Sequence, residues 1–292
     1  VWSWHLWFAP QSALTPIEVT NHQGVKYNFT TENLGWKPTG EISTYDKPRT
    51  VKVRIEHTIA NNGTKQHTDV VITQNPGSKK GGIMTYYQFG RKDAFPGTAI
   101  VFPDKKPSDF VSDDNMSIIN GIQNPDKIYR NQYTWQVSPI SYTSYAYYNL
   151  WSAGNTTLSY NDNPVIKTIY DPSPVGFKMP ASNAFTGFTR TGGNISGNTN
   201  VNADGTADSE DKFAAAYGHN FWTNGSRSTI IYFPISGRYT INGLLEVSGY
   251  GFYWSAIPDV SGFARNFTFY WYTVSPVFNY NRSAGYAVRP VT

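Results

Sequence analysis

The chain has 292 residues, of which only 15% are charged, and its net charge of +4 comes from lysines and arginines scattered along the sequence. A nucleic-acid-binding protein gathers basic residues into a patch or stripe, so this pattern argues against nucleic acid as a partner. The absence of cysteine excludes disulfides, thiolate metal sites and cysteine nucleophiles. Aromatic residues make up 16% of the chain. No apolar run approaches the ~18 residues of a membrane-spanning helix, so we expect a β- and loop-rich protein without a membrane span.

The chain begins with alternating aromatic and polar residues. Trp2, Trp4 and Leu6 alternate with Ser3 and His5, which predicts a strand over residues 1–9. Mature N-termini rarely start inside an apolar strand. We therefore expect upstream domains and an export signal to precede this chain.

A β-hairpin is predicted around residues 49–75. Residues 50–56 alternate with period two, Asn61-Asn62-Gly63 is a turn sequence, and residues 69–74 form the returning strand. No break in composition separates two domains. We interpret the hairpin as an insertion in a single domain that spans residues 1–292.

The middle of the chain contains one predicted helix among loops and strands. Pro180, Ser182, Phe185 and Phe188 predict a short capped helix from about 182 to 189. Residues 191–212 are rich in Gly, Asn, Asp and Ser and predict a loop. Strand-like segments follow at 229–233, 238–241, 250–255, 265–273 and 286–291.

The loop contains one pattern of oxygen ligands at alternate positions. Asn200, Asn202, Asp204, Asp208 and Asp211 loosely follow a calcium loop with a central glycine. The first position is Asn, the last is Asp instead of Glu, and no clear helix precedes the loop. A solvated loop is therefore the favoured interpretation, calcium is the alternative, and we expect no other cofactor.

Signatures of catalysis are missing from the sequence. The five histidines lack metal-ligand spacing, and no nucleophile elbow, phosphate loop or dinucleotide-binding glycine motif occurs. Carboxylates are sparse, and the neighbouring pairs in loops do not make an acid and a base on two sides of a substrate. An enzyme is therefore disfavoured.

The last third of the chain concentrates aromatic residues and asparagine. Tyr and Trp give rigid amphipathic contact area, and Asn and Ser give adaptable hydrogen bonds, which is the composition of a recognition surface. One phase of the strands is expected to be core: Phe267, Phe269 and Trp271. The other phase and the following loop are expected to be exposed: Tyr270, Tyr272, Tyr280 and Asn281. Residues 286–291 predict a buried closing strand in which the planar fork of Arg289 anchors several carbonyl groups.

Several motifs in order carry a family resemblance. They include residues 87–97 (YQFGRKDAFPG), residues 169–180 (IYDPSPVGFKMP) and residues 281–291 (NRSAGYAVRPV). Together they resemble the C-terminal domain of fimbrillin-like surface proteins of Bacteroidetes-type bacteria, related to the major paralogous domain family. The resemblance covers nearly the whole chain.

The resemblance implies an α+β, C-type-lectin-like fold of the kind found in formylglycine-generating enzymes, with few short helices and buried terminal strands. It also implies that pilin domains lie upstream. Family members commonly carry Cys at the positions of Ser173 and Pro290, and the cysteine pair of the sulfatase-activating relatives is absent here. That absence argues against their chemistry.

The ending also resembles the variable proteins of diversity-generating retroelements. In those proteins, scaffold residues stay fixed while ligand-facing positions vary among Asn, Tyr, Ser, Asp and similar residues. The resemblance implies these ligand-facing positions here: Phe252, Tyr253, Phe263, Arg265, Asn266, Tyr270, Tyr272, Phe278, Tyr280, Asn281 and Ser283.

From these patterns we expect an extracellular adhesin domain at the pilus tip or cell surface of a Gram-negative bacterium. It would bind a host protein or glycan through the Tyr/Asn-rich C-terminal surface and contact other pilin subunits through its upstream region. One alternative is a structural pilus subunit whose 49–75 hairpin and N-terminal strand dock onto other domains. Another is a divergent formylglycine-generating-type enzyme or a glycoside hydrolase, which would need a deep cleft with converging carboxylates.

Overall fold

The computed structural model describes residues 5–43, 49–58, 63–74, 78–97, 107–115, 118–131, 150–154, 157–243, 245–246, 249–259 and 263–292. Residues 1–4 of the predicted N-terminal strand lie outside this part of the chain, as do Asn61 and Asn62 of the predicted turn. Residues 5–9 are described and have no regular secondary structure, so the strand prediction is wrong there.

The protein is mostly β-sheet. Strands account for 39% of the structure and helices for 13%, and the strands form small sheets that are antiparallel with one exception. The expectation of an α+β, C-type-lectin-like fold is therefore wrong. The longest helices in the described part are α2 (Glu210–Ala216) and the 3-10 helix η5 (Ser182–Phe188), with seven residues each. Helices this short cannot form a separate packing layer.

The remaining described helical segments are short: η1 (Gln11–Leu14), η3 (Pro107–Phe110), α1 (Ile118–Gln123) and η6 (Asn198–Asn200). The first half contains strands β1 (Ile17–Thr20), β2 (Lys26–Phe29), β3 (Lys37–Ser43), β4 (Arg49–Thr58), β5 (Lys65–Gln74), β6 (Ser78–Ile83), β7 (Thr85–Gln88), β8 (Phe95–Pro96), β9 (Val111–Asn115) and β10 (Ile128–Asn131). The second half contains β11 (Ile195–Ser196), β12 (Gly218–Trp222), β13 (Ile230–Pro234), β14 (Arg238–Tyr239), β15 (Leu245–Glu246), β16 (Gly251–Pro258), β17 (Phe263–Phe269), β18 (Thr273–Asn281) and β19 (Gly285–Tyr286).

Two larger sheets organise the body of the molecule. One has the order β11-β18-β17-β16, and the other has the order β15-β14-β19-β7-β8. The remaining strands pair two by two, as β1-β2, β3-β6, β4-β5, β12-β13 and the parallel pair β10-β9. Because β19 lies in the middle of the five-stranded sheet, the C-terminal segment is enclosed by strands from both halves of the chain.

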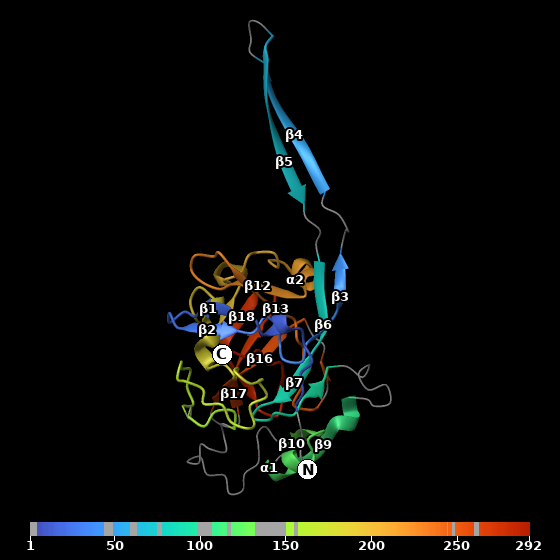
Figure 1. Ribbon diagram of the computed structural model, residues 1–292, viewed down its shortest axis with the longest axis vertical. Helices are drawn as coiled ribbons and strands as arrows, with labels where there is room; N and C mark the ends of the chain where they lie inside the picture. Colours follow the sequence, from blue (N-terminus) through green and yellow to red (C-terminus); the bar gives the residue numbers. More distant parts are fainter. Residues whose placement is uncertain are drawn as a thin grey trace.

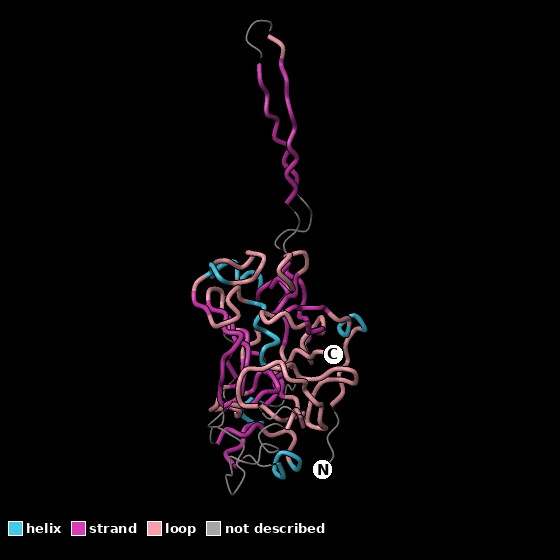
Figure 2. Tube along the Cα trace, turned by 90° about the vertical axis from the view of Figure 1, so that its left-hand side faces the viewer, coloured by secondary structure: helices cyan, strands magenta, loops and turns pink. Residues whose placement is uncertain are grey.

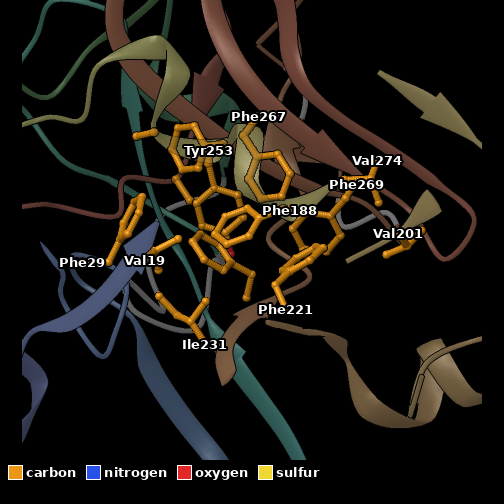
Figure 3. Packing of buried hydrophobic residues seen from close by; sticks show 14 of the residues in the cluster. Val19, Phe29, Phe188, Val201, Phe221, Ile231, Tyr253, Phe267, Phe269 and Val274 are labelled. Carbon is orange, nitrogen blue, oxygen red and sulfur yellow. The ribbon is translucent and has the colours of Figure 1, made fainter. Parts of the chain in front are cut away.

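The main core lies on one face of the four-stranded sheet, where η5 contacts β16, β17 and β18. Figure 3 shows the rings of Phe188, Phe221, Phe267 and Phe269 facing one another in this cluster. The Phe188 and Phe221 rings stack with centroids 4.6 Å apart. Phe267 and Phe269 are fully buried as predicted, because alternate residues of β17 point to this face.

The predicted helix at 182–189 is present, as the 3-10 helix η5. Ser182 does not cap it, because the residue before the helix is Ala181 and no side chain makes the capping hydrogen bond. The hydroxyl of Ser182 accepts instead from the Asn161 backbone N–H across 3.0 Å. It thereby ties the helix start to the loop that precedes it.

The predicted strand over 265–273 is two strands with a turn between them. β17 ends at Phe269 and β18 begins at Thr273, and the Tyr270 N–H donates to the Thr273 carbonyl across 2.7 Å to close the turn. Trp271 therefore lies in the turn. It is only partly buried, so its expected core position is wrong.

A long arm leaves the body. β3 and β6 pair at its base, and β4 and β5 pair from Arg49↔Gln74 to Thr58↔Lys65, in the range where the sequence predicts a hairpin. In both Figure 1 and Figure 2 the β4–β5 ribbon extends away from the rest of the chain.

Candidate functional site: an aromatic strip beside the central sheet

Aromatic rings line up along one end of the four-stranded sheet. The ring centroids of Tyr272 and Tyr270 are 5.7 Å apart, those of Tyr270 and Tyr250 are 4.6 Å apart, and those of Tyr250 and Phe252 are 5.8 Å apart. The ring centroids of Trp271 and Tyr272 are 4.7 Å apart. We use the name aromatic strip for six residues: Tyr250, Phe252, Tyr270, Trp271, Tyr272 and Tyr280.

The sheet register brings the strip together. Gly251, the first residue of β16, pairs with Phe269, the last residue of β17. Tyr250 therefore lies next to Tyr270, the first residue of the turn, and the two rings stack with an interplanar angle of 20°. A Cβ on Gly251 would lie 2.2 Å from the Phe269 ring, so a glycine is needed for this close approach.

Within the strip, Arg238 lies against both Phe252 and Tyr280. Its guanidinium lies 4.7 Å from the Phe252 ring centroid and 5.0 Å from the Tyr280 ring centroid. Its Nε also donates to Glu246 Oε2 across 2.7 Å. Cation–π contacts of this kind orient a guanidinium while its remaining N–H groups can still donate.

Behind the strip the rings enter the core. The rings of Tyr280 and Tyr286 stack with their centroids 5.9 Å apart, and the rings of Tyr286 and Trp254 stack with their centroids 4.2 Å apart. Tyr286 and Trp254 are fully buried. Except for the buried Phe252, the strip is thus the partly exposed edge of a packed aromatic layer, which holds its rings in place before any ligand arrives.

The exposed part of the strip is centred on Tyr250 and Tyr272, which are 39% and 37% exposed. Tyr270 is partly exposed and its hydroxyl donates to Glu210 Oε1 across 2.6 Å, which raises the pKa of Tyr270 to about 12. Stacking surfaces, a phenol and an Arg–Glu pair therefore lie along one edge. This combination can hold a flat apolar face and several hydrogen-bonding groups of a ligand.

A buried histidine supports the turn from below. His219 Nε2 lies 3.2 Å from the Tyr270 carbonyl oxygen, and the ring packs among Phe213, Phe221 and Phe269. Burial lowers the pKa of His219 to about 4. The neutral ring therefore donates to the turn at neutral pH.

Arg265 lies at the other end of β17 and is held by structural contacts. Its guanidinium donates to Asp259 Oδ1 across 2.9 Å and lies 3.8 Å from the Tyr160 ring centroid. The Asn279 side-chain amide donates to the other Asp259 oxygen across 2.5 Å. These contacts tie β17 and β18 to the loop around Tyr160, away from the strip.

The predicted ligand-facing residues fall into three groups. Four belong to the aromatic strip: Phe252, Tyr270, Tyr272 and Tyr280. Phe252 of the strip is itself buried, with 6% of its surface exposed, and four further residues are buried: Tyr253, Asn266, Asn281 and Ser283. Three lie elsewhere on β17 and β18 with partly or largely exposed side chains: Phe263, Arg265 and Phe278.

The expected exposure of Asn281 is wrong. It is the last residue of β18 and pairs with Phe263, so it is 93% buried, with 7% of its surface exposed. Sequence reasoning also missed Tyr250, Arg238 and Glu246. Tyr250 belongs to an aromatic run that was visible in the sequence, whereas Arg238 and Glu246 reach the strip only because β14 pairs with β19.

The predicted calcium residues make separate contacts. Asp204 accepts hydrogen bonds from Thr206 and Asn220, and Asp208 pairs with Lys212 Nζ at 2.7 Å. The Asn202 amide donates to the Gly187 carbonyl across 2.8 Å. Asn200 and Asp211 are exposed. Within the described residues, no group of three or more His, Cys, Asp or Glu side chains could hold a metal ion, and calcium binding stays a prediction.

A cavity of about 300 Å³ lies between the N-terminal segment and residues 171–174. His5 is one of its lining residues, and its ring nitrogens are both bonded, with Nδ1 2.9 Å from the Pro172 carbonyl oxygen and Nε2 3.0 Å from the Tyr87 hydroxyl. Asp171 is the one carboxylate among its lining residues, and both of its oxygens accept backbone N–H groups, from Ser173 and Met179. This cavity does not offer the two converging carboxylates that a glycoside hydrolase would need.

No protein-family model, no curated protein and no solved structure matches the chain. The candidate site therefore rests on its geometry. Among the helices in the described part of the chain, none has the length and apolar character required to cross a membrane.

Proposed function

We propose that this chain is the ligand-binding domain of a cell-surface or pilus-tip adhesin related to the fimbrillin-like proteins, and that the aromatic strip is its recognition surface. The ligand is a host protein or glycan. The observation that carries the proposal is the continuous row of ring contacts from Tyr272 through Tyr250 to Phe252, exposed at one end and packed into the core at the other.

The chemistry of the strip suits recognition. Aromatic faces stack on the apolar face of a sugar ring or on an aliphatic side chain, and Tyr, Trp and Arg dominate the energy of binding at interfaces. Arg238 and Glu246 supply directional hydrogen bonds at the rim of the strip. Because the rings are held by their neighbours, little side-chain entropy is lost on binding.

The proposal is tested by screening the purified chain against arrays of host glycans and host surface proteins. The variants are Tyr250→Ala and Tyr272→Ala, which remove exposed rings without opening the core. Val175→Ala is the control, because Val175 is also exposed and lies far along the chain from the strip. We expect both tyrosine variants to lose at least about fivefold in affinity for the array ligand, since truncating an aromatic residue that carries binding energy costs more than about 1 kcal/mol.

Unchanged binding in both tyrosine variants would refute the strip as the site. Circular dichroism on the same samples separates loss of binding from loss of fold. The second candidate function is a structural pilus subunit. It would be supported if the purified chain bound no array component and the tyrosine variants still assembled into pili. The observation that favours this second candidate is the projecting β4–β5 arm.

A further inference from the structure

The β4–β5 arm has two chemically different faces. Cross-strand pairs put Val51 with Ile72 and Val53 with Val70 on one face, followed toward the tip by Ile55 with Thr68. The five aliphatic side chains of this face are 41–60% exposed. No described part of the chain covers them, and the ribbon stands away from the body in both views of the molecule.

The opposite face carries the charges. The described part of the arm between Thr50 and Thr73 contains five charged residues. All five lie on this face: Lys52, Arg54, Glu56, Lys65 and Asp69. They are paired among themselves. Asp69 accepts from Lys52 at 2.7 Å and from Arg54 at 2.8 Å, and Lys65 pairs with Glu56 at 2.7 Å.

The exposed apolar face of the arm needs a second layer to pack against. A two-stranded ribbon alone is marginally stable in water, and a sheet face of Val and Ile is normally packed against another layer. The charged face is solvated, and its charges pair with one another, so it needs no partner. From Val51 to His57 on β4 and from Gln66 to Ile72 on β5, the apolar face carries no Lys, Arg, Asp or Glu, so an uncharged aliphatic surface complements it.

We propose that the apolar face of the arm packs against the same face of a second copy of this chain. Turned end for end, a second arm meets the first with the Val53–Val70 pair at the centre. The Ile55 end of each arm then lies against the Val51–Ile72 end of the other. The interface is self-complementary, as a two-fold axis requires.

The shape of the arm permits this dimer. Ten residues at ~3.3 Å per residue make each strand ~33 Å long, and stacked sheets pack ~10 Å apart. Two antiparallel arms put the two bodies at opposite ends, so the bodies do not collide. Both charged faces point outward, away from each other. A ribbon face is small beside the ~1,200–2,000 Å² of a standard interface, so dimerisation is weak and depends on concentration.

The test measures the self-association of the purified chain by sedimentation equilibrium over a wide range of concentration. The variants are Val70→Lys and Val71→Lys. These are adjacent valines of β5 that are 44% and 59% exposed and lie on opposite faces of the ribbon. We expect Val70→Lys to weaken dimerisation at least about tenfold and Val71→Lys to leave it within about twofold, because only the first buries a charge in the contact.

Cross-linking gives an independent readout. Since the chain has no cysteine, Val70→Cys and Val71→Cys each introduce a unique thiol. A short bis-maleimide should join Val70→Cys chains into dimers and leave Val71→Cys chains monomeric. A monomeric chain at all concentrations, or equal cross-linking of the two variants, overturns the proposal. Because the arm is separate from the aromatic strip, either result is independent of ligand binding at the strip.

Discussion

The Arg289 guanidinium donates from Nε to the Thr30 carbonyl across 2.6 Å, joining the last residues of the chain to the segment after β2. It also donates to the Thr31 carbonyl across 2.5 Å, to Asn33 Oδ1 across 3.0 Å and to the Tyr232 carbonyl across 3.3 Å. Arg289 is 99% buried, and burial lowers its pKa to about 10. The sequence-based prediction that this residue anchors several carbonyl groups is confirmed.

We expect Arg289→Met to destabilise the chain by about 3 kcal/mol or more, because each buried acceptor left without a donor costs ~1–3 kcal/mol. Arg289→Lys should recover only part of the loss, since an ammonium cannot reproduce the planar fork. The measurement is urea unfolding followed by tryptophan fluorescence. Arg190→Met, at an exposed arginine, is the control and should change the free energy of unfolding by less than about 0.5 kcal/mol. Similar losses in both variants would contradict the anchoring role.

The buried His219 makes stability depend on pH. Its pKa is about 4 in the folded chain against an ordinary value of 6.5, so between these values the unfolded chain binds a proton that the folded chain does not. Its contribution to stability is full above pH 6.5 and falls as the pH drops, by on the order of 3 kcal/mol once the pH reaches about 4.

The variant His219→Phe should flatten this part of the stability curve, because its aromatic neighbours accept a phenyl ring that has no proton to bind. Unfolding in urea at a series of pH values between 4 and 7 measures the slope. His5, whose pKa burial also lowers, contributes a slope of the same sign that remains in the variant. An unchanged slope in His219→Phe would show that another group carries the dependence.

Tyr217 ends helix α2 in a left-handed conformation, with φ of 54°. A residue with a side chain is strained there, whereas glycine is not. Tyr217→Gly should therefore stabilise the chain by about 0.5–1 kcal/mol, the relief of strain exceeding the added backbone entropy of the unfolded chain. Thermal unfolding measures the effect. In the same helix Ala215→Gly should do the opposite and cost about 1 kcal/mol, and a loss in both variants would argue against the strain at Tyr217.

Gly251 is required by the packing under the strip. Because its Cβ would lie 2.2 Å from the Phe269 ring, Gly251→Ala should cost about 1–3 kcal/mol as the ring is displaced. Near-ultraviolet circular dichroism should report the altered environment of the neighbouring tyrosines. Gly225→Ala provides a matched comparison, since a Cβ there meets nothing within 4 Å, and it should be close to neutral. A neutral result at Gly251 would mean that the ring moves freely.

Local sequence patterns predicted the features that depend on near neighbours. Alternation predicted the hairpin around 49–75 and the inward phase of Phe267 and Phe269, since a strand's side chains alternate between two faces whatever lies beyond them. The apolar ending with one arginine predicted a buried terminus. Composition and a family resemblance did not predict the fold class correctly, because short elements can be combined in many ways that local patterns do not distinguish.

The candidate site shows the same division. Tyr270, Tyr272 and Tyr280 were expected on the exposed surface because of their phase and their type. Trp271 was assigned to the core because the turn between β17 and β18 was not recognised, and Asn281 was expected to be exposed although pairing with Phe263 buries it.

The sequence by itself determined where aromatic residues gather, which strand faces are apolar and which residue anchors the terminus. These properties follow from residue type and spacing. Only the tertiary structure decided that Tyr250 stacks on Tyr270, that Arg238 lies between Phe252 and Tyr280, and that the apolar face of the arm is uncovered. Each of these depends on which strands become neighbours, and that choice is made by the packing of the whole chain.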